Sequence, residues 1–239
     1  MMRTVIISLV PLIISSIYFF GWRSLVLLFW VTLFGVAMEW IYEKKQGKKI
    51  SEAIFVTCIL YVLTLPPRTP IWIAVVGIIF GVFFGKEVFG GFGRNLFNPA
   101  LVARAFVYVT FPEPLTIEWS KAATGFPGGF TTYITENIDA ITQATPMLIF
   151  RETGEMVSSL KLLLGNVSGS LGETSAILII LAGIYLIYKK VAAWQTMAGA
   201  LIGFTGLSGA LYFLGNPQIP NPIFGILSGG FLFGMIFMA

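Results

Sequence analysis

Long apolar runs separated by short polar breaks cover most of this chain. A membrane-spanning helix needs about 20 mainly apolar residues, and several of the runs reach or approach that length. We predict spans at residues 3–20, 24–42, 52–65, 71–88, 98–111, 174–188, 193–214 and 222–239. The pattern predicts an all-α polytopic membrane protein with about eight spans, folded as a single membrane domain over residues 1–239.

The longest polar stretch, residues 112–173, separates the fifth run from the sixth. With the N-terminus inside and the spans alternating, this stretch is predicted to be a loop on the outer face. The basic residues beside the runs agree, because Lys and Arg are enriched in short inner segments. The predicted inner positions are Arg3, Lys44, Lys45, Lys48, Lys49, Lys86, Arg94, Lys189 and Lys190, and those in short outer loops are Arg23 and Arg68.

Composition supports the membrane class and argues against several others. The chain has 239 residues, of which 56% are hydrophobic and 11% charged, and its mean hydropathy is +0.87. Soluble proteins carry about 25% charged residues, so we expect no second, soluble domain. Much of the positive charge lies beside apolar runs, which indicates topology signals and not nucleic-acid binding.

The chain contains no histidine and a single cysteine, Cys58. It therefore lacks the commonest metal ligand, and one cysteine cannot form an internal disulfide or hold an iron–sulfur cluster, which needs about four ligands. We predict no metal site and expect Cys58 to be a small buried core residue. No small-residue cleavage site follows the first apolar run, so we expect a retained span and not a signal peptide.

Residues 86–100 read Lys-Glu-Val-Phe-Gly-Gly-Phe-Gly-Arg-Asn-Leu-Phe-Asn-Pro-Ala. The three glycines disfavour a continuous helix, and Asn98 followed by Pro99 is typical of a new helix start. A helix broken at membrane depth must be buried in protein or line a cavity. We therefore predict a buried break at a binding site or ion pathway; the alternative is a plain surface loop between two spans.

Residues 169–175, Gly-Ser-Leu-Gly-Glu-Thr-Ser, precede the sixth run. Ser170 and Glu173 have the spacing of a capping box, which predicts a helix N-terminus at this point. Such an N-terminus can also receive a phosphate group.

Three charged residues lie in or beside apolar runs, where charge is costly and commonly functional. Glu39 lies near the predicted inner boundary, and we expect its side chain to reach the interface. Glu87 adjoins the glycine-rich segment and is the better candidate for an ion pathway. Arg104 is predicted to pair with an anionic cofactor group or with Glu87.

Residues 139–145 in the polar loop read Asp-Ala-Ile-Thr-Gln-Ala-Thr. Asp139, Thr142, Ala144 and Thr145 match the acceptor sequence Asp-Gly-x-(Ser/Thr)-(Gly/Ser)-Ala-Thr, in which FMN is attached to the last threonine through a phosphoester. The second and fifth positions depart from that sequence. The proline after Thr145 favours an extended backbone at the acceptor, which suits access by an enzyme.

Segments 86–100, 139–145 and 169–175, in this order, resemble the RnfD/NqrB family. Its members are integral membrane subunits of the Rnf complex and of the sodium-pumping NADH:quinone oxidoreductase. The resemblance implies about ten spans in two inverted halves with broken half-helices, covalent FMN on Thr145, and a bacterial cytoplasmic (inner) membrane. It also implies that Asn95 and Asn98 hold a second, non-covalent flavin such as riboflavin or line the ion path.

The implied partners are the other subunits of an Rnf/Nqr-type complex, including a second flavin-bearing subunit and iron–sulfur subunits, together with the flavin transferase and the lipid bilayer. This chain has no nucleotide-binding motif, so we expect it to be part of an enzyme and not catalytic alone. Its apolar start favours the RnfD subunit of a ferredoxin:NAD⁺ oxidoreductase coupled to Na⁺ or H⁺ transport. The alternatives are the NqrB subunit of the Na⁺-pumping, quinone-reducing complex, a urea/ammonium-type channel with no flavin, and a scaffold subunit.

Overall fold

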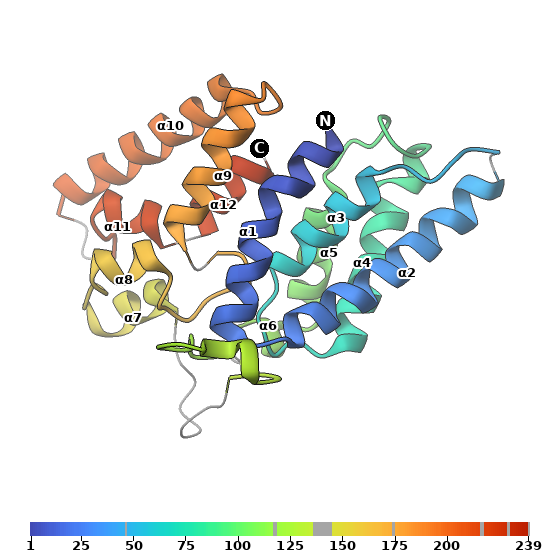
Figure 1. Cartoon of the computed structure of the whole chain (residues 1–239). Helices are drawn as coiled ribbons and strands as arrows, with labels where there is room; N and C mark the ends of the chain where they lie inside the picture. Colours follow the sequence, from blue (N-terminus) through green and yellow to red (C-terminus); the bar gives the residue numbers. More distant parts are fainter. Residues whose placement is uncertain are drawn as a thin grey trace.

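The computed structural model describes residues 1–45, 47–116, 119–135, 145–173, 175–215, 218–228 and 230–238. All regular secondary structure in these residues is helical, in twelve α-helices and two short 3₁₀ segments (Figure 1). The long elements are α1 (Met2–Phe20), α2 (Arg23–Lys45), α3 (Ala53–Leu63), α4 (Ile71–Gly85), α5 (Pro99–Thr110), α9 (Ala176–Tyr188) and α10 (Trp194–Phe213). They match the first seven predicted runs.

The eighth predicted run forms two helices, α11 (Pro222–Leu227) and α12 (Gly230–Phe237). The remaining elements are short: η1 (Glu87–Phe89), α6 (Pro112–Thr116), η2 (Gly128–Thr131), α7 (Pro146–Thr153) and α8 (Ser159–Leu164). Within the described ranges, four segments are long and apolar enough to cross a membrane, namely α1, α2, the Ile71–Phe89 segment and α10. Helices α3, α5 and α9 are shorter apolar helices. The chain is a polytopic membrane protein; the count of about eight spans and the inverted repeat stay predictions.

The helices form two groups in Figure 1, α2 to α5 on one side and α9 to α12 on the other. Helix α1 lies between them and packs against α2, α3 and α9. One continuous hydrophobic cluster runs through both groups and includes Leu12 of α1 and Ile179 of α9. Cys58 belongs to this cluster and is fully buried, which confirms its prediction as a core residue.

Helices α4 and α5 approach closely because the contact surface of α4 is partly glycine. A Cβ atom on Gly81 would overlap Ala103 of α5. Removing side chains from the contact allows the two backbones to pack directly, as is common between membrane helices. This packing fixes the position of α5 and hence of Arg104.

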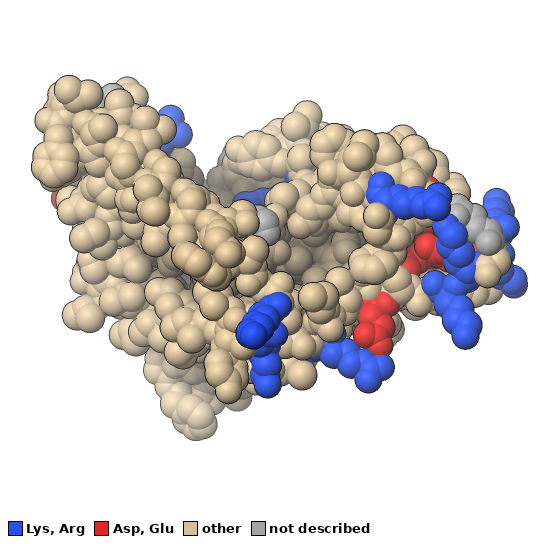
Figure 2. Space-filling model, turned by 90° about the horizontal axis from the view of Figure 1, so that it is seen from above, with Lys and Arg blue, Asp and Glu red and all other residues tan. Residues whose placement is uncertain are grey.

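Residues predicted to lie on opposite membrane faces gather at opposite ends of the molecule. At one end, Arg23 Nη2 donates to the carbonyl oxygens of Arg68 at 3.1 Å and Thr69 at 3.0 Å. At the other end, Lys48 Nζ donates to the Gly90 carbonyl at 2.9 Å. Figure 2 views the end that carries the N-terminus, where Lys and Arg gather at one side; Lys44, Lys45, Lys48 and Lys49 are all exposed. The two ends agree with the predicted alternation, and the assignment of inside and outside stays a prediction.

Candidate functional site

A cavity of about 350 Å³ lies where α5, the start of α7, the loop before α9, α10 and the α11–α12 junction meet. Its polar lining comes from Arg104, Thr145, Ser168, Ser170, Glu173 and Ser228. Its aromatic lining comes from Trp119, Phe204 and Phe231, and the last two stack with ring centroids 4.1 Å apart. We call this the Thr145 cavity. Two segments that the sequence singled out, 139–145 and 169–175, therefore contribute residues to one site.

Thr145 is the N-cap of α7 and is half-buried. Its backbone is extended, with φ −62° and ψ 156°, as the following Pro146 predicted. Its hydroxyl oxygen accepts a hydrogen bond from the Leu148 amide at 3.4 Å. Because the first N–H groups of a helix have no partner within it, the start of α7 presents a partial positive charge that favours an anion at this point.

The other matching residues of the acceptor sequence, Asp139, Thr142 and Ala144, lie outside the described residues. Their predicted role in recognition by a flavin transferase stays a prediction.

The predicted capping box at Ser170 and Glu173 is wrong. Helix α9 begins only at Ala176 with Ser175 as N-cap, so neither residue lies in its first turn. The segment instead closes the end of α3: the Leu171 amide donates to the Leu65 carbonyl at 3.1 Å and the Gly172 amide to the Leu63 carbonyl at 2.8 Å. Carbonyl groups at a helix C-terminus need such outside donors.

The Ser170 hydroxyl takes no part in closing the end of α3. Ser170 is 1% exposed, and its oxygen has no hydrogen-bond partner among the described residues. A buried hydroxyl without a partner is costly, and this one lines the Thr145 cavity. It is a donor that a bound molecule can use.

Arg104 pairs with Glu173, whose Oε1 lies 3.2 Å from Arg104 Nη1. The alternative expectation of Glu87 as its partner is wrong, because Arg104 lines the cavity whereas Glu87 is buried in a separate cluster beside α2. The Arg104 side chain is 36% exposed and that of Glu173 is 12% exposed. The pair therefore places a cation and an anion at the same cavity wall.

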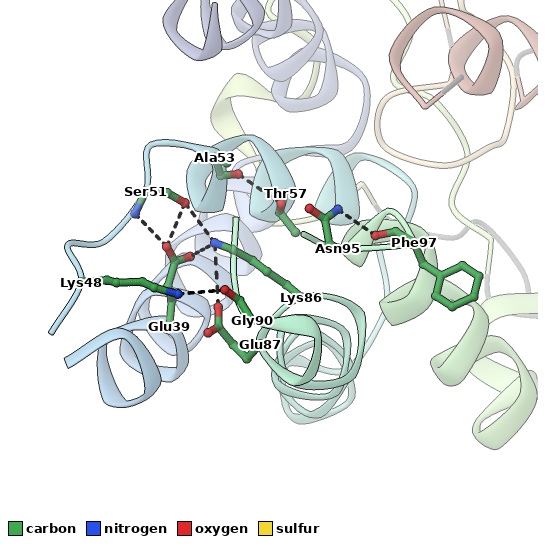
Figure 3. Close-up of polar contacts among 10 residues, drawn as sticks. All are labelled: Glu39, Lys48, Ser51, Ala53, Thr57, Lys86, Glu87, Gly90, Asn95 and Phe97. Carbon is green, nitrogen blue, oxygen red and sulfur yellow. Dashed lines mark hydrogen bonds and ion pairs between the residues drawn. The ribbon is translucent and has the colours of Figure 1, made fainter. Parts of the chain in front are cut away.

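A second polar site lies where α2, the segment before α3 and the end of α4 meet (Figure 3). Lys86 Nζ lies 2.6 Å from Glu39 Oε2 and 3.9 Å from Glu87 Oε1, and it donates to the Ser51 hydroxyl at 3.0 Å. Glu39 Oε1 accepts from the Ser51 amide at 2.7 Å and from its hydroxyl at 2.9 Å. We call these four residues the Lys86 cluster.

The expectation that Glu39 reaches the interface is wrong, since Glu39 is 0% exposed. The cost of burying this carboxylate is offset by Lys86 and Ser51, which come from other elements. Glu87 is also buried, and neither of its carboxylate oxygens accepts a hydrogen bond from the described residues. The cluster thus holds two carboxylates around one cation and has unused acceptors, as an exchangeable cation or proton would require.

Glu43 lies one helical turn after Glu39 and is buried as well, with its Oε2 unpaired among the described residues. Sequence reasoning missed Glu43 and Lys86 as parts of a buried site, although the four-residue spacing of Glu39 and Glu43 places them on one face of α2. Within the described ranges, no group of three or more Asp, Glu, Cys or His side chains is arranged to hold a metal ion.

The glycine-rich segment, residues 86–100, was expected to be either a buried helix break or a plain surface loop, and it combines features of both. Lys86, Glu87 and Gly91 are buried, whereas Phe92 and Leu96 are exposed. Helix α5 begins as predicted, because the Asn98 side chain accepts from the Ala100 amide at 3.0 Å and Pro99 follows. Asn95 donates to the Phe97 carbonyl at 3.0 Å. The start of the segment is therefore a buried break, and its remainder is surface.

Apolar helices define a polytopic membrane protein, and its fold encloses a lined cavity and a buried charge cluster. The family model described as NQR2, RnfD, RnfE matches residues 1–239, and the chain belongs to this family. Three relatives are each named as the B subunit of a Na(+)-translocating NADH-quinone reductase. The Klebsiella pneumoniae (strain 342) protein is 36% identical over 234 residues, 92% of this chain and 55% of that protein.

The Yersinia pestis protein is 34% identical over 236 residues, with 92% of this chain and 55% of the relative covered. The Azotobacter vinelandii (strain DJ / ATCC BAA-1303) protein is 38% identical over 207 residues, with 84% and 49% covered. The chain spans about half the length of the curated relatives it matches.

Proposed function

We propose that Thr145 carries FMN through a phosphoester and that the flavin occupies the Thr145 cavity. The observation that carries this proposal is the position of Thr145: an extended N-cap threonine, followed by proline, on the wall of a cavity with polar and aromatic sides. FMN supplies one-electron and two-electron transfer when bound, and the protein supplies position and electrostatics.

The cavity lining fits the two chemical parts of FMN. The start of α7 suits the phosphate, because the dipole of a helix favours negative charge at its N-terminus. Phe204, Phe231 and Trp119 supply flat apolar surface for a ring system. Ser170 and Arg104 supply hydrogen-bond donors for the polar edge of that ring system.

We further propose that the chain is a membrane subunit of a redox-driven ion-translocating complex in a bacterial cytoplasmic membrane. The names of the relatives support the Na⁺-translocating NADH-quinone reductase type, and we propose the NqrB subunit of such a complex in preference to the RnfD subunit favoured by the sequence pattern. The Rnf type stays the second candidate, because the family model includes RnfD. Proteins copurifying with the chain, identified by mass spectrometry, distinguish the two.

The Lys86 cluster is the proposed place at which this chain binds the transported ion. Its support is the surplus of buried carboxylate oxygens around Lys86. The relatives' names favour Na⁺ over H⁺. Electrons are proposed to enter and leave through partner subunits that hold iron–sulfur clusters and a further flavin, since the single cysteine of this chain cannot hold a cluster.

The test is ultraviolet fluorescence of the protein after denaturing electrophoresis, from cells that also express the flavin transferase. Wild type is expected to fluoresce and Thr145→Ala is expected to be dark. Thr153→Ala, at the other end of α7, is the matched control and should fluoresce as wild type does. Dark wild-type protein, with the transferase active on a control substrate, would overturn the proposal that Thr145 carries FMN.

A further inference from the structure

The wall of the Thr145 cavity contributed by α5 carries a cation that the acceptor sequence does not explain. Arg104 lies in the middle of an apolar helix, where a charged side chain is costly and needs a partner. Its described contact is a single hydrogen bond, from Nη1 to Glu173 Oε1 at 3.2 Å. A guanidinium has five N–H donors, so this contact uses one of them.

We propose that Arg104 and Glu173 form an opposed pair that sets the reduction potential of the flavin in this cavity, Arg104 raising it and Glu173 lowering it. The inference rests on the proposed attachment of FMN to Thr145. It adds the two residues that tune the cofactor, which neither the acceptor sequence nor the relatives' names identify.

Arg104 is assigned to the flavin ring system because the phosphate and the Arg104 cation are placed by different elements that line the cavity. The phosphate is fixed at Thr145, where the start of α7 already provides a favourable dipole. Arg104 comes from a different element, α5, and pairs with Glu173. The Ser170 hydroxyl, which has no hydrogen-bond partner among the described residues, lines the same cavity. The cation is therefore available to the far end of a flavin tethered at Thr145.

Charge explains the direction of the effect. Reduction of the oxidised ring system by two electrons, with uptake of one proton from water, adds one negative charge to the cavity. A nearby cation stabilises that charge by electrostatic attraction. A nearby carboxylate has the opposite effect. Arg104 and Glu173 together leave this wall close to neutral, so removing either one unbalances it.

The experiment is a spectroelectrochemical titration of the full-length protein loaded with FMN, using dithionite as reductant. Arg104→Gln is expected to shift the equilibrium toward the oxidised flavin by about tenfold, which for a two-electron couple lowers the midpoint potential by about 30 mV. Glu173→Gln is expected to shift it the other way by a similar factor. Arg104→Lys should keep most of the wild-type potential.

Arg151→Gln is the matched control, because Arg151 is exposed on α7 and does not line the cavity. It removes the same charge and should leave the potential unchanged. A general loosening of the cavity would shift Arg104→Gln and Glu173→Gln in the same direction, and that result overturns the proposal.

In-gel fluorescence of each variant separates this inference from the proposed function. Wild-type protein without flavin means that attachment at Thr145 is wrong, and the inference falls with it. Fluorescent variants with unchanged potentials mean that attachment stands and the role of Arg104 and Glu173 is wrong. If Arg104→Gln does not load flavin, Glu173→Gln decides alone: a raised potential supports the inference, and an unchanged or lowered one refutes it.

Discussion

Lys86 Nζ lies 2.6 Å from Glu39 Oε2, and both side chains are buried in the contact between α2 and the end of α4. The two residues come from different predicted spans, and their ion pair ties those spans together. A buried ion pair contributes little net stability compared with apolar residues, but breaking it leaves an uncompensated charge. Displacing either helix from the other would therefore leave a buried charge without its partner.

Lys86→Met should destabilise the protein by about 3–5 kcal/mol, because Glu39 and Glu87 lose their cation. The double variant Lys86→Met with Glu39→Gln should recover part of this loss. Thermal unfolding of the purified protein in detergent measures both. Arg3→Gln is the matched control: it breaks the exposed Arg3–Glu52 ion pair and should change the unfolding midpoint little. Equal losses in Lys86→Met and Arg3→Gln would contradict the account.

Glu87→Gln should weaken the binding of Na⁺ at the ion site proposed for the Lys86 cluster. Its carboxylate has two buried oxygens without hydrogen bonds from the described residues, and the substitution removes one negative charge from the cluster. We expect the Na⁺ concentration for half-maximal activity to rise about tenfold, which corresponds to about 1.4 kcal/mol, while flavin fluorescence stays at the wild-type level. Unchanged Na⁺ dependence in the loaded complex would exclude Glu87 from ion binding.

Gly172→Ala should destabilise the Thr145 cavity. A Cβ at this position would lie 2.7 Å from Leu63 Cβ, so the loop that closes α3 must move. Overpacking of this kind costs about 1–3 kcal/mol, and we expect a lower unfolding midpoint and weaker flavin fluorescence. Gly169→Ala, in the same loop, meets no atom within 4 Å and should keep the wild-type unfolding midpoint. Gly169 lines the cavity, so this control applies to the unfolding midpoint and not to the flavin fluorescence. Identical unfolding midpoints for the two variants would show that this packing is unimportant.

Thr142→Ala should reduce flavin attachment without removing the acceptor. Thr142 belongs to the predicted recognition sequence, whereas Thr145 is the proposed site of the phosphoester. In-gel fluorescence normalised to protein measures the degree of loading. Full loading of Thr142→Ala would limit the recognition sequence to residues nearer Thr145.

The helical elements were largely predictable from the sequence because apolar runs and punctuating residues are local signals. Asn98 followed by Pro99 predicted the start of α5, and Pro146 predicted the extended backbone at Thr145. The split of the last run into α11 and α12 was not predicted, although the glycines at 229 and 230 offered a signal.

The pairing of charges was not predictable in the same way. Arg104 and Glu173 are 69 residues apart in sequence, and the tertiary fold alone brings them together. The spacing of Ser170 and Glu173 fitted a capping box, but the loop satisfies the end of α3 and α9 starts later. Local spacing could not distinguish these outcomes, because the competing partners come from distant segments.

The most direct test of the account is mass-spectrometric peptide mapping of the flavin-loaded protein. The account predicts that the FMN-bearing peptide contains Thr145, that fragmentation places the phosphoester on that residue, and that Thr145→Ala yields only unmodified peptide. Wild-type peptide that stays unmodified in the presence of an active transferase, or FMN located on another residue, would contradict it.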